Sequence, residues 1–131
     1  MDKAVTYLYV AAGSALGGMG RYWVSGLVAQ RVGRSFPWGT VLVNISGSFL
    51  IGLFAALVAT EGRFAAPARF REFFMIGICG GYTTFSSFSL ETLNLARDGQ
   101  WFYAGANAVV SVMLCFAAVW LGHLLGQILN R

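Results

Sequence analysis

The stretch "TVLVNISGSFLIGLFAALVAT", residues 40–60, contains no charged residue. About 20 consecutive apolar residues are enough for a helix to cross the hydrocarbon core of a bilayer. The stretch therefore predicts a transmembrane helix and places the chain among membrane proteins. The whole composition agrees, because 57% of the 131 residues are hydrophobic and 11% are charged, whereas soluble domains average about 25% charged residues.

Three further apolar runs lie around this stretch, at about residues 5–28, 73–95 and 101–125. Their connections are short, and they leave no room for a soluble domain. We therefore expect an all-α membrane protein in which residues 1–131 form a single domain of four transmembrane helices. The first run is longer than the apolar core of a signal peptide and three more spans follow it, so we expect it to be retained.

Basic residues are divided almost evenly between the two sides of such a bundle. The side with both termini and the middle loop holds Lys3, Arg63, Arg69, Arg71 and Arg131. The other side holds Arg31, Arg34 and Arg97, and Arg21 if it is counted. The positive-inside rule then gives only a weak preference. Two oppositely oriented copies could pair as an antiparallel dimer, or the small bias could suffice for one orientation. The net charge of +4 is typical of loops beside lipid headgroups and does not require nucleic acid.

The third run contains "GGYTTFSSFSLE", residues 80–91, with two adjacent glycines and six hydroxyl side chains. Glycine weakens helices, so we expect the third helix to be broken near Gly80–Thr83. Carbonyl groups freed by a break cannot stay bare at membrane depth. Water, side chains or a cation can satisfy them, as broken membrane helices do with Na⁺.

Phe85 and Phe88 follow this break, three residues apart. Aromatic ring edges carry partial positive charge, and hydroxyl groups and the Asn44 amide can donate hydrogen bonds. Such neutral groups can hold a small anion without trapping it, which conduction requires. The alternative is that both rings face lipid or a neighbouring helix.

Residues four apart share one face of a helix, and two polar stripes have this spacing. They consist of Thr40, Asn44, Ser48 and Gly52, and of Tyr103, Asn107, Ser111 and Cys115. Each stripe is either a contact between helices or a conduction path. The GxxxG pairs Gly13/Gly17 and Gly77/Gly81 predict close helix approach.

Few residues in the apolar runs are ionisable. Arg21 either reaches the membrane interface or lines an aqueous vestibule. Glu91 is either a buried proton carrier or a polar end residue bonded to a neighbouring helix. Cys79 and Cys115 have no metal-binding spacing and read as buried thiols. With His123 as its one histidine, the chain offers no catalytic set, so we do not expect an enzyme.

Two long motifs resemble the Fluc (CrcB) family of fluoride channels. They are "WGTVLVNISGSFLIG", residues 38–52, and "GICGGYTTFSSFSLE", residues 77–91, and Arg21 in "GGMGRYW" matches an arginine after a glycine-rich first helix. The resemblance covers essentially the whole chain. It implies four-helix subunits that form antiparallel, dual-topology homodimers with two fluoride pores.

The resemblance also implies roles for individual positions. The phenylalanine pair of the family falls on Phe85 and Phe88, its pore asparagine on Asn44 and its vestibule arginine on Arg21. Thr40 and Ser111 continue the polar track. A structural Na⁺ at the centre of the dimer would be held by backbone carbonyl groups at Gly80 and Thr83. The role of Glu91 stays open.

These observations predict a passive, fluoride-selective channel in a bacterial inner membrane. The main alternative is a small proton-coupled exporter, of the fluoride/proton or multidrug type. Such exporters also use four spans, but usually carry an acid in the first span, where this chain has none. A third reading is a non-transporting scaffold, which would not explain the cluster of hydroxyls, amide and phenylalanines.

Overall fold

The computed structural model describes residues 2–59 and 64–131, and all regular structure within them is helical. Helix α1 spans Lys3–Val32 and α2 spans Trp38–Leu57. A third rod consists of α3 (Ala68–Arg71), the π-helix η1 (Glu72–Cys79), α4 (Gly80–Tyr82) and α5 (Phe85–Arg97). Helix α6 spans Trp101–Leu129. The all-α prediction is confirmed.

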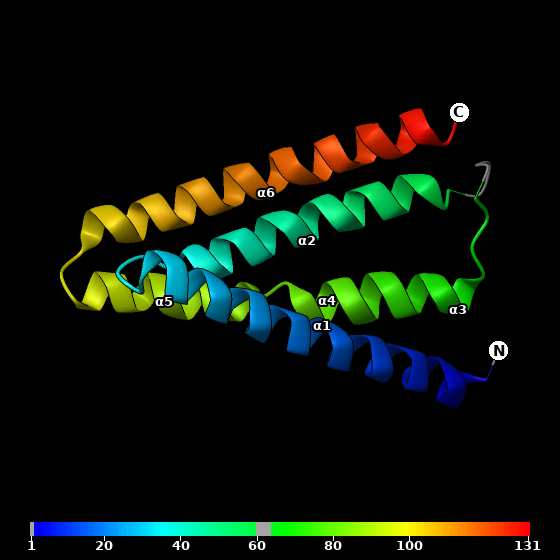
Figure 1. Cartoon of the computed structure of the whole chain (residues 1–131), viewed down its shortest axis with the longest axis horizontal. Coiled ribbons are helices and arrows are strands. Elements are labelled where there is room, and N and C mark those ends of the chain that lie inside the picture. Colours follow the sequence, from blue (N-terminus) through cyan, green and yellow to red (C-terminus); the bar gives the residue numbers. More distant parts are fainter. Residues whose placement is uncertain (1, 60–63) are drawn as a thin grey trace.

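Successive rods run in opposite directions, so both termini lie at the same end of the molecule (Figure 1). By length and composition, three helices within the described ranges are able to cross a membrane: Trp38–Leu57, Ala68–Arg97 and Trp101–Leu129. Helix α1 has the length but a more polar composition, including Arg21 and Gln30. Its role as the fourth span stays a prediction.

Glycines allow the helices to approach closely. A Cβ atom added to Gly77 would lie 2.8 Å from the Cα of Gly13, and one added to Gly81 would lie 2.7 Å from the carbonyl oxygen of Ser14. The two GxxxG pairs therefore pack α1 against the η1–α4 segment, as predicted. A second seam joins α2 to α6, where a Cβ on Gly126 would lie 2.6 Å from that of Ala56.

The third rod is broken, but not at the glycine pair. Gly80 has helical backbone angles, φ −66° and ψ −36°, and it begins α4. The extended residues are Thr83 (φ −76°, ψ 156°) and Thr84 (φ −153°, ψ 110°). The break thus lies at the C-terminal end of the predicted range Gly80–Thr83 and extends to Thr84. Gly81 serves close packing on α1, and the polar partners of Thr84 determine where the helix stops.

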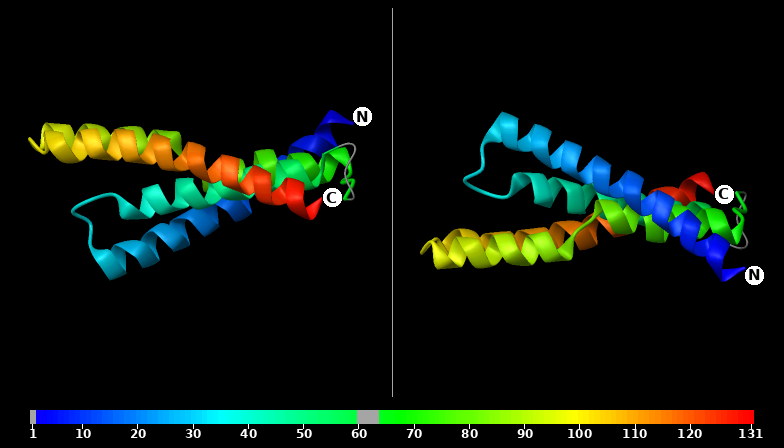
Figure 2. Two further views of the ribbon diagram at one scale, coloured as in Figure 1. Left: turned by 90° about the horizontal axis from the view of Figure 1, so that it is seen from above. Right: turned by 90° about the horizontal axis from the view of Figure 1, so that it is seen from below.

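The rods diverge toward the end opposite the termini. There α1 and the start of α2 separate from α5 and the start of α6, so the molecule has the shape of a V (Figure 2). The turn between α5 and α6 is tight, with Gly99 at φ +77° and a hydrogen bond from Gln100 N to Leu95 O of 2.8 Å. Within "RDGQ", residues 98–100 thus form the connection between these two helices. The divergence leaves one face of α5 open toward α1 and α2.

Candidate functional site

The side chain of Asn44 in α2 holds the break in the third rod. Its Nδ2 donates to the carbonyl oxygen of Thr84 at 3.0 Å, and its Oδ1 accepts from the Thr84 backbone N–H at 2.7 Å. Thr84 then caps α5, because its Oγ1 accepts from Ser87 N at 3.1 Å. A threonine hydroxyl at this position satisfies one of the free amides at the start of a helix. One amide side chain therefore replaces the lost backbone partners of an extended residue.

These bonds remove the normal partners of two carbonyl groups. In a continuous helix, Gly80 O would accept from Thr84 N, and Thr83 O from Ser87 N. Both donors are instead used by side chains, Asn44 Oδ1 and Thr84 Oγ1. A Cβ added to Gly80 would meet only Met75 O within 4 Å, at 3.8 Å, and Gly80 is exposed. Carbonyl oxygens in this state are suitable ligands for Na⁺, and they belong to the positions assigned to it from the sequence.

A cavity of about 350 Å³ brings most of the predicted site together. It lies between α2, the break, α5 and α6. Its walls include four of the predicted pathway residues and both predicted cation positions: Asn44, Phe85, Phe88, Ser111, Gly80 and Thr83. The remaining wall is mainly apolar, with Ser48, Cys79 and Cys115 among the other lining residues. Residues from distant parts of the sequence thus form one site.

The two phenylalanine rings stand close together at this cavity. Their centroids are 5.3 Å apart and their planes are tilted by 53°. Phe85 is 75% exposed in the single chain, although it lines the cavity and follows a polar segment. The cavity wall beside the rings is mainly apolar, and the exposed Phe85 ring is open to contact with lipid or with another protein chain.

Ser111 is connected to the phenylalanine segment through buried polar groups. Its Oγ donates to Asn107 Oδ1 at 3.2 Å, Asn107 Nδ2 donates to Thr92 Oγ1 at 2.8 Å, and Thr92 Oγ1 donates to Phe88 O at 2.7 Å. Asn107 is 1% exposed. The sequence placed Asn107 in a polar stripe but not among the site residues. Its spacing of four from Ser111 was the available signal.

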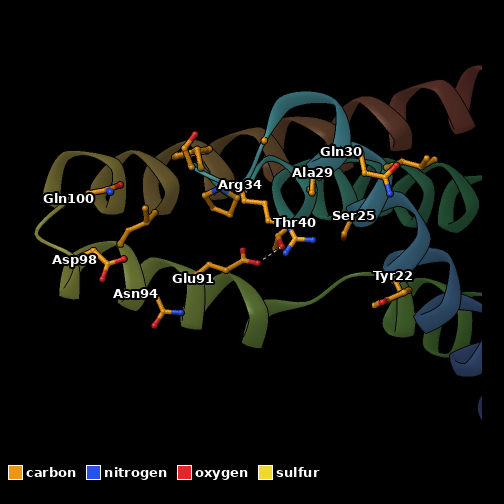
Figure 3. Close-up of a pocket in the computed structure, with 18 of the residues that line it drawn as sticks. Tyr22, Ser25, Ala29, Gln30, Arg34, Thr40, Glu91, Asn94, Asp98 and Gln100 are labelled. Carbon is orange, nitrogen blue, oxygen red and sulfur yellow. Dashed lines mark hydrogen bonds between the residues drawn. The ribbon is translucent and has the colours of Figure 1, made fainter.

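Thr40 lies outside this cavity. Its Oγ1 donates to Glu91 Oε1 at 2.8 Å, and both residues line a larger cavity of about 860 Å³ between α1, α2 and α5 (Figure 3). Arg34, Asn94 and Asp98 line the same space. Glu91 Oε2 is buried and has no hydrogen-bond partner in the described part of the chain. The Thr40–Glu91 pair thus belongs to a separate cavity, which shares no lining residue with the narrower one.

Arg21 is half-buried on α1 and is absent from the walls of both cavities described here. The single chain therefore does not bring it together with the other predicted site residues. Its place in a vestibule stays a prediction, which depends on a second copy.

The outer surface is rich in large apolar side chains. Tyr22 is 85% exposed and Phe102 82%, and exposed leucine, valine and phenylalanine side chains extend along all the long helices. Exposed apolar surface on this scale marks contact with lipid or with another protein chain. This agrees with the membrane character predicted from the composition.

Comparison with known proteins gives consistent matches over nearly the whole chain. The model of the family described as "CrcB-like protein, Camphor Resistance (CrcB)" matches residues 8–123. Proteins named "Fluoride-specific ion channel FluC" are among its relatives. The one from Opitutus terrae is 60% identical over 124 residues, which cover 95% of this chain and 94% of that protein. The one from Rhodospirillum rubrum is 58% identical over 127 residues, covering 97% and 98%. The chain therefore belongs to the CrcB-like family.

Proposed function

We propose that this protein is a fluoride-selective ion channel that lets cytoplasmic fluoride leave passively. The observation that carries the proposal is the 350 Å³ cavity, where Asn44, Phe85, Phe88 and Ser111 converge without a fully charged side chain. The names of close relatives covering nearly the whole chain support it. Neutral donors and ring edges favour a small anion that forms strong hydrogen bonds, whereas chloride is larger and gains less from each donor.

The proposed functional unit is an antiparallel, dual-topology homodimer with two pores in a bacterial inner membrane, with α1 as its fourth span. The nearly even charge distribution and the exposed Phe85 ring support this arrangement. Each pore would receive its aromatic rings from both subunits. Arg21 would then face the vestibule through which the anion enters, and Thr40 would extend the polar track toward the cavity.

A structural Na⁺ at the dimer axis fits the break in the third rod. The carbonyl oxygens of Gly80 and Thr83 would hold it, since the donors they would have in a helix are used by Asn44 and Thr84. The described residues contain no group of three or more His, Cys, Asp or Glu placed to hold a metal ion, so backbone oxygens are the suitable ligands. The ion would supply fixed positive charge between two copies and stabilise the break.

Fluoride efflux from liposomes that hold the purified protein tests the proposed function. We expect efflux that follows the fluoride gradient and needs no proton gradient. Chloride-loaded liposomes serve as the matched control and are expected to keep their chloride. Equal fluxes of the two anions would reject the proposal.

A proton-coupled exporter is the second candidate, because Glu91 Oε2 is buried and has no hydrogen-bond partner among residues 2–59 and 64–131. Glu91 also lines the 860 Å³ cavity. Glu91→Gln keeps the size of the side chain and its ability to accept from Thr40 Oγ1, but cannot carry a proton. A passive channel should still release fluoride down its gradient when this change is made. Complete loss of a transport that depends on the pH gradient would instead favour the exporter.

A further inference from the structure

Three hydrogen bonds link Ser111 through Asn107 and Thr92 to Phe88 O, and in each of them the residue nearer Ser111 is the donor. Thr92 Oγ1 has one proton and donates it to Phe88 O at 2.7 Å. Toward Asn107 it therefore acts only as an acceptor, which requires the Asn107 amide to present Nδ2 to it. The Oδ1 of Asn107 then faces Ser111 and accepts its only proton. The hydroxyl groups of Thr92 and Ser111 have one proton each, and both protons are already used in these hydrogen bonds.

This direction gives Ser111 the wrong polarity for an anion. Ser111 lines the 350 Å³ cavity, whereas Asn107 lies behind its wall and is 1% exposed. With its proton turned to Asn107, Ser111 presents only oxygen lone pairs to the cavity. Lone pairs repel an anion, whereas a free hydroxyl proton would bind it through a charge-assisted hydrogen bond.

The same side chains can satisfy their hydrogen bonds in the opposite direction. If the Asn107 amide turns over, Thr92 Oγ1 donates to Asn107 Oδ1 and Asn107 Nδ2 donates to Ser111 Oγ. Ser111 is then free to point its proton into the cavity, and the amide N–H that donates to its oxygen strengthens it as a donor. Phe88 O gives up its bond from Thr92. The 3.2 Å distance between Ser111 Oγ and Asn107 Oδ1 is long for a hydroxyl donor, so the bond that must break first is a weak one.

We propose that Asn107 is a positioning residue that changes Ser111 from an acceptor to a donor when an anion enters the cavity. The inference rests on the proposed function, and it adds a regulated donor to that pathway. Asn107 does not touch the anion. Its amide decides which way the Ser111 hydroxyl points, and Thr92 holds the direction seen in this structure.

Two substitutions separate this role from a static brace between α5 and α6. Asn107→Leu removes the amide donor to Ser111, and the Ser111 hydroxyl can instead donate to the backbone carbonyl of residue 107, one helical turn back. We therefore expect the half-saturating fluoride concentration for efflux to rise about tenfold. Thr92→Val removes the group that keeps Nδ2 turned away from Ser111, so we expect that concentration to fall below the wild-type value. A static brace predicts a shift in the same direction for both, because each change breaks the same Thr92–Asn107 bond.

The experiment measures fluoride efflux from liposomes over a range of internal fluoride, with assembly checked by size-exclusion chromatography. Ser111→Ala provides the reference background, in which Asn107→Leu should have no further effect. Thr92→Ser keeps the hydroxyl group and both of its hydrogen bonds, so its half-saturating fluoride concentration should equal that of the wild type. Opposite shifts for Asn107→Leu and Thr92→Val support the switch. Shifts in the same direction, or an Asn107 effect that persists without Ser111, overturn the switch. Wild-type efflux in that case leaves the proposed function standing. Absence of wild-type efflux overturns both.

Discussion

At the scale of single residues, Asn44 contributes most to the shape of the site. It lies 40 residues before Thr84 and still satisfies both its N–H and its C=O. No pattern within residues 80–91 reveals this partner, so the sequence predicted the break near Gly80–Thr83 but not the side chain that holds it. Glycine was taken as the cause because it weakens helices, whereas the polar clamp and the threonine cap determine where α5 begins.

Replacing Asn44 by alanine should therefore affect stability as well as transport. Asn44→Ala leaves two backbone groups of Thr84 without partners in a half-buried region. We expect a loss of about 2–4 kcal/mol in the free energy of unfolding and loss of fluoride efflux. Thermal unfolding in detergent measures the first effect. Gln127→Ala, at an exposed amide on α6, is the matched control, and equal unfolding temperatures for the two variants would contradict this account.

The phenylalanine pair is predicted to act on transport without carrying the fold. Phe85→Ile and Phe88→Ile keep apolar bulk but remove the positive ring edge. We expect each change to lower fluoride efflux by at least about tenfold, while the size-exclusion profile stays that of the wild type. A scaffold without transport function would show neither wild-type efflux nor any difference between these variants.

Most of the predicted site residues meet, but not all. Asn44, Phe85, Phe88 and Ser111 line one cavity, because two polar stripes and the hydroxyl-rich segment face each other across α2, α5 and α6. Thr40 lies in the neighbouring cavity, bonded to Glu91. The spacing of four correctly placed Thr40 and Asn44 on one face of α2. It cannot show that Thr40 lines one cavity and Asn44 the other. That division depends on where the third rod breaks.

At the scale of elements, the glycine seam between α1 and the third rod was predictable from the GxxxG spacing. The π-helix Glu72–Cys79 was not, since wide helical turns depend on tertiary packing and carry no simple sequence signal. It ends where the seam is tightest, at the glycines opposite Gly13 and Gly17. The π-helix thus occurs where the backbones of α1 and the third rod approach each other closely.

Adjacent glycines in α1 test this seam. A Cβ on Gly17 would collide with the backbone at Ile78 and lie 2.8 Å from Tyr82 N, whereas one on Gly18 would meet nothing within 4 Å. We expect Gly17→Ala to lower the free energy of unfolding by about 1–3 kcal/mol through overpacking. Gly18→Ala should raise it by up to about 1 kcal/mol, because alanine favours a helix. Thermal unfolding measures both changes. If the free energy of unfolding changed in the same direction in both variants, the result would contradict close packing at Gly17.

At the scale of the whole molecule, the proposed antiparallel dimer requires insertion in both orientations, which the nearly even charge distribution allows. Asp2→Arg with Ala65→Arg increases the charge of the side that holds both termini, and Lys3→Gln with Arg69→Gln and Arg71→Gln reduces it. Each set should force one orientation and abolish efflux when its variant is made alone. Coexpression of the two variants should restore efflux, measured in liposomes. Full activity of either variant alone would exclude the antiparallel dimer.

The central claim is that neutral donors and ring edges, without fixed cationic side chains, select fluoride in the cavity. Parallel recordings of fluoride and chloride release, from liposomes containing the wild-type protein under identical gradients, test it most directly. The account predicts rapid fluoride release with chloride retained at the level of protein-free liposomes. Release of chloride at the fluoride rate, or retention of both anions, would contradict it.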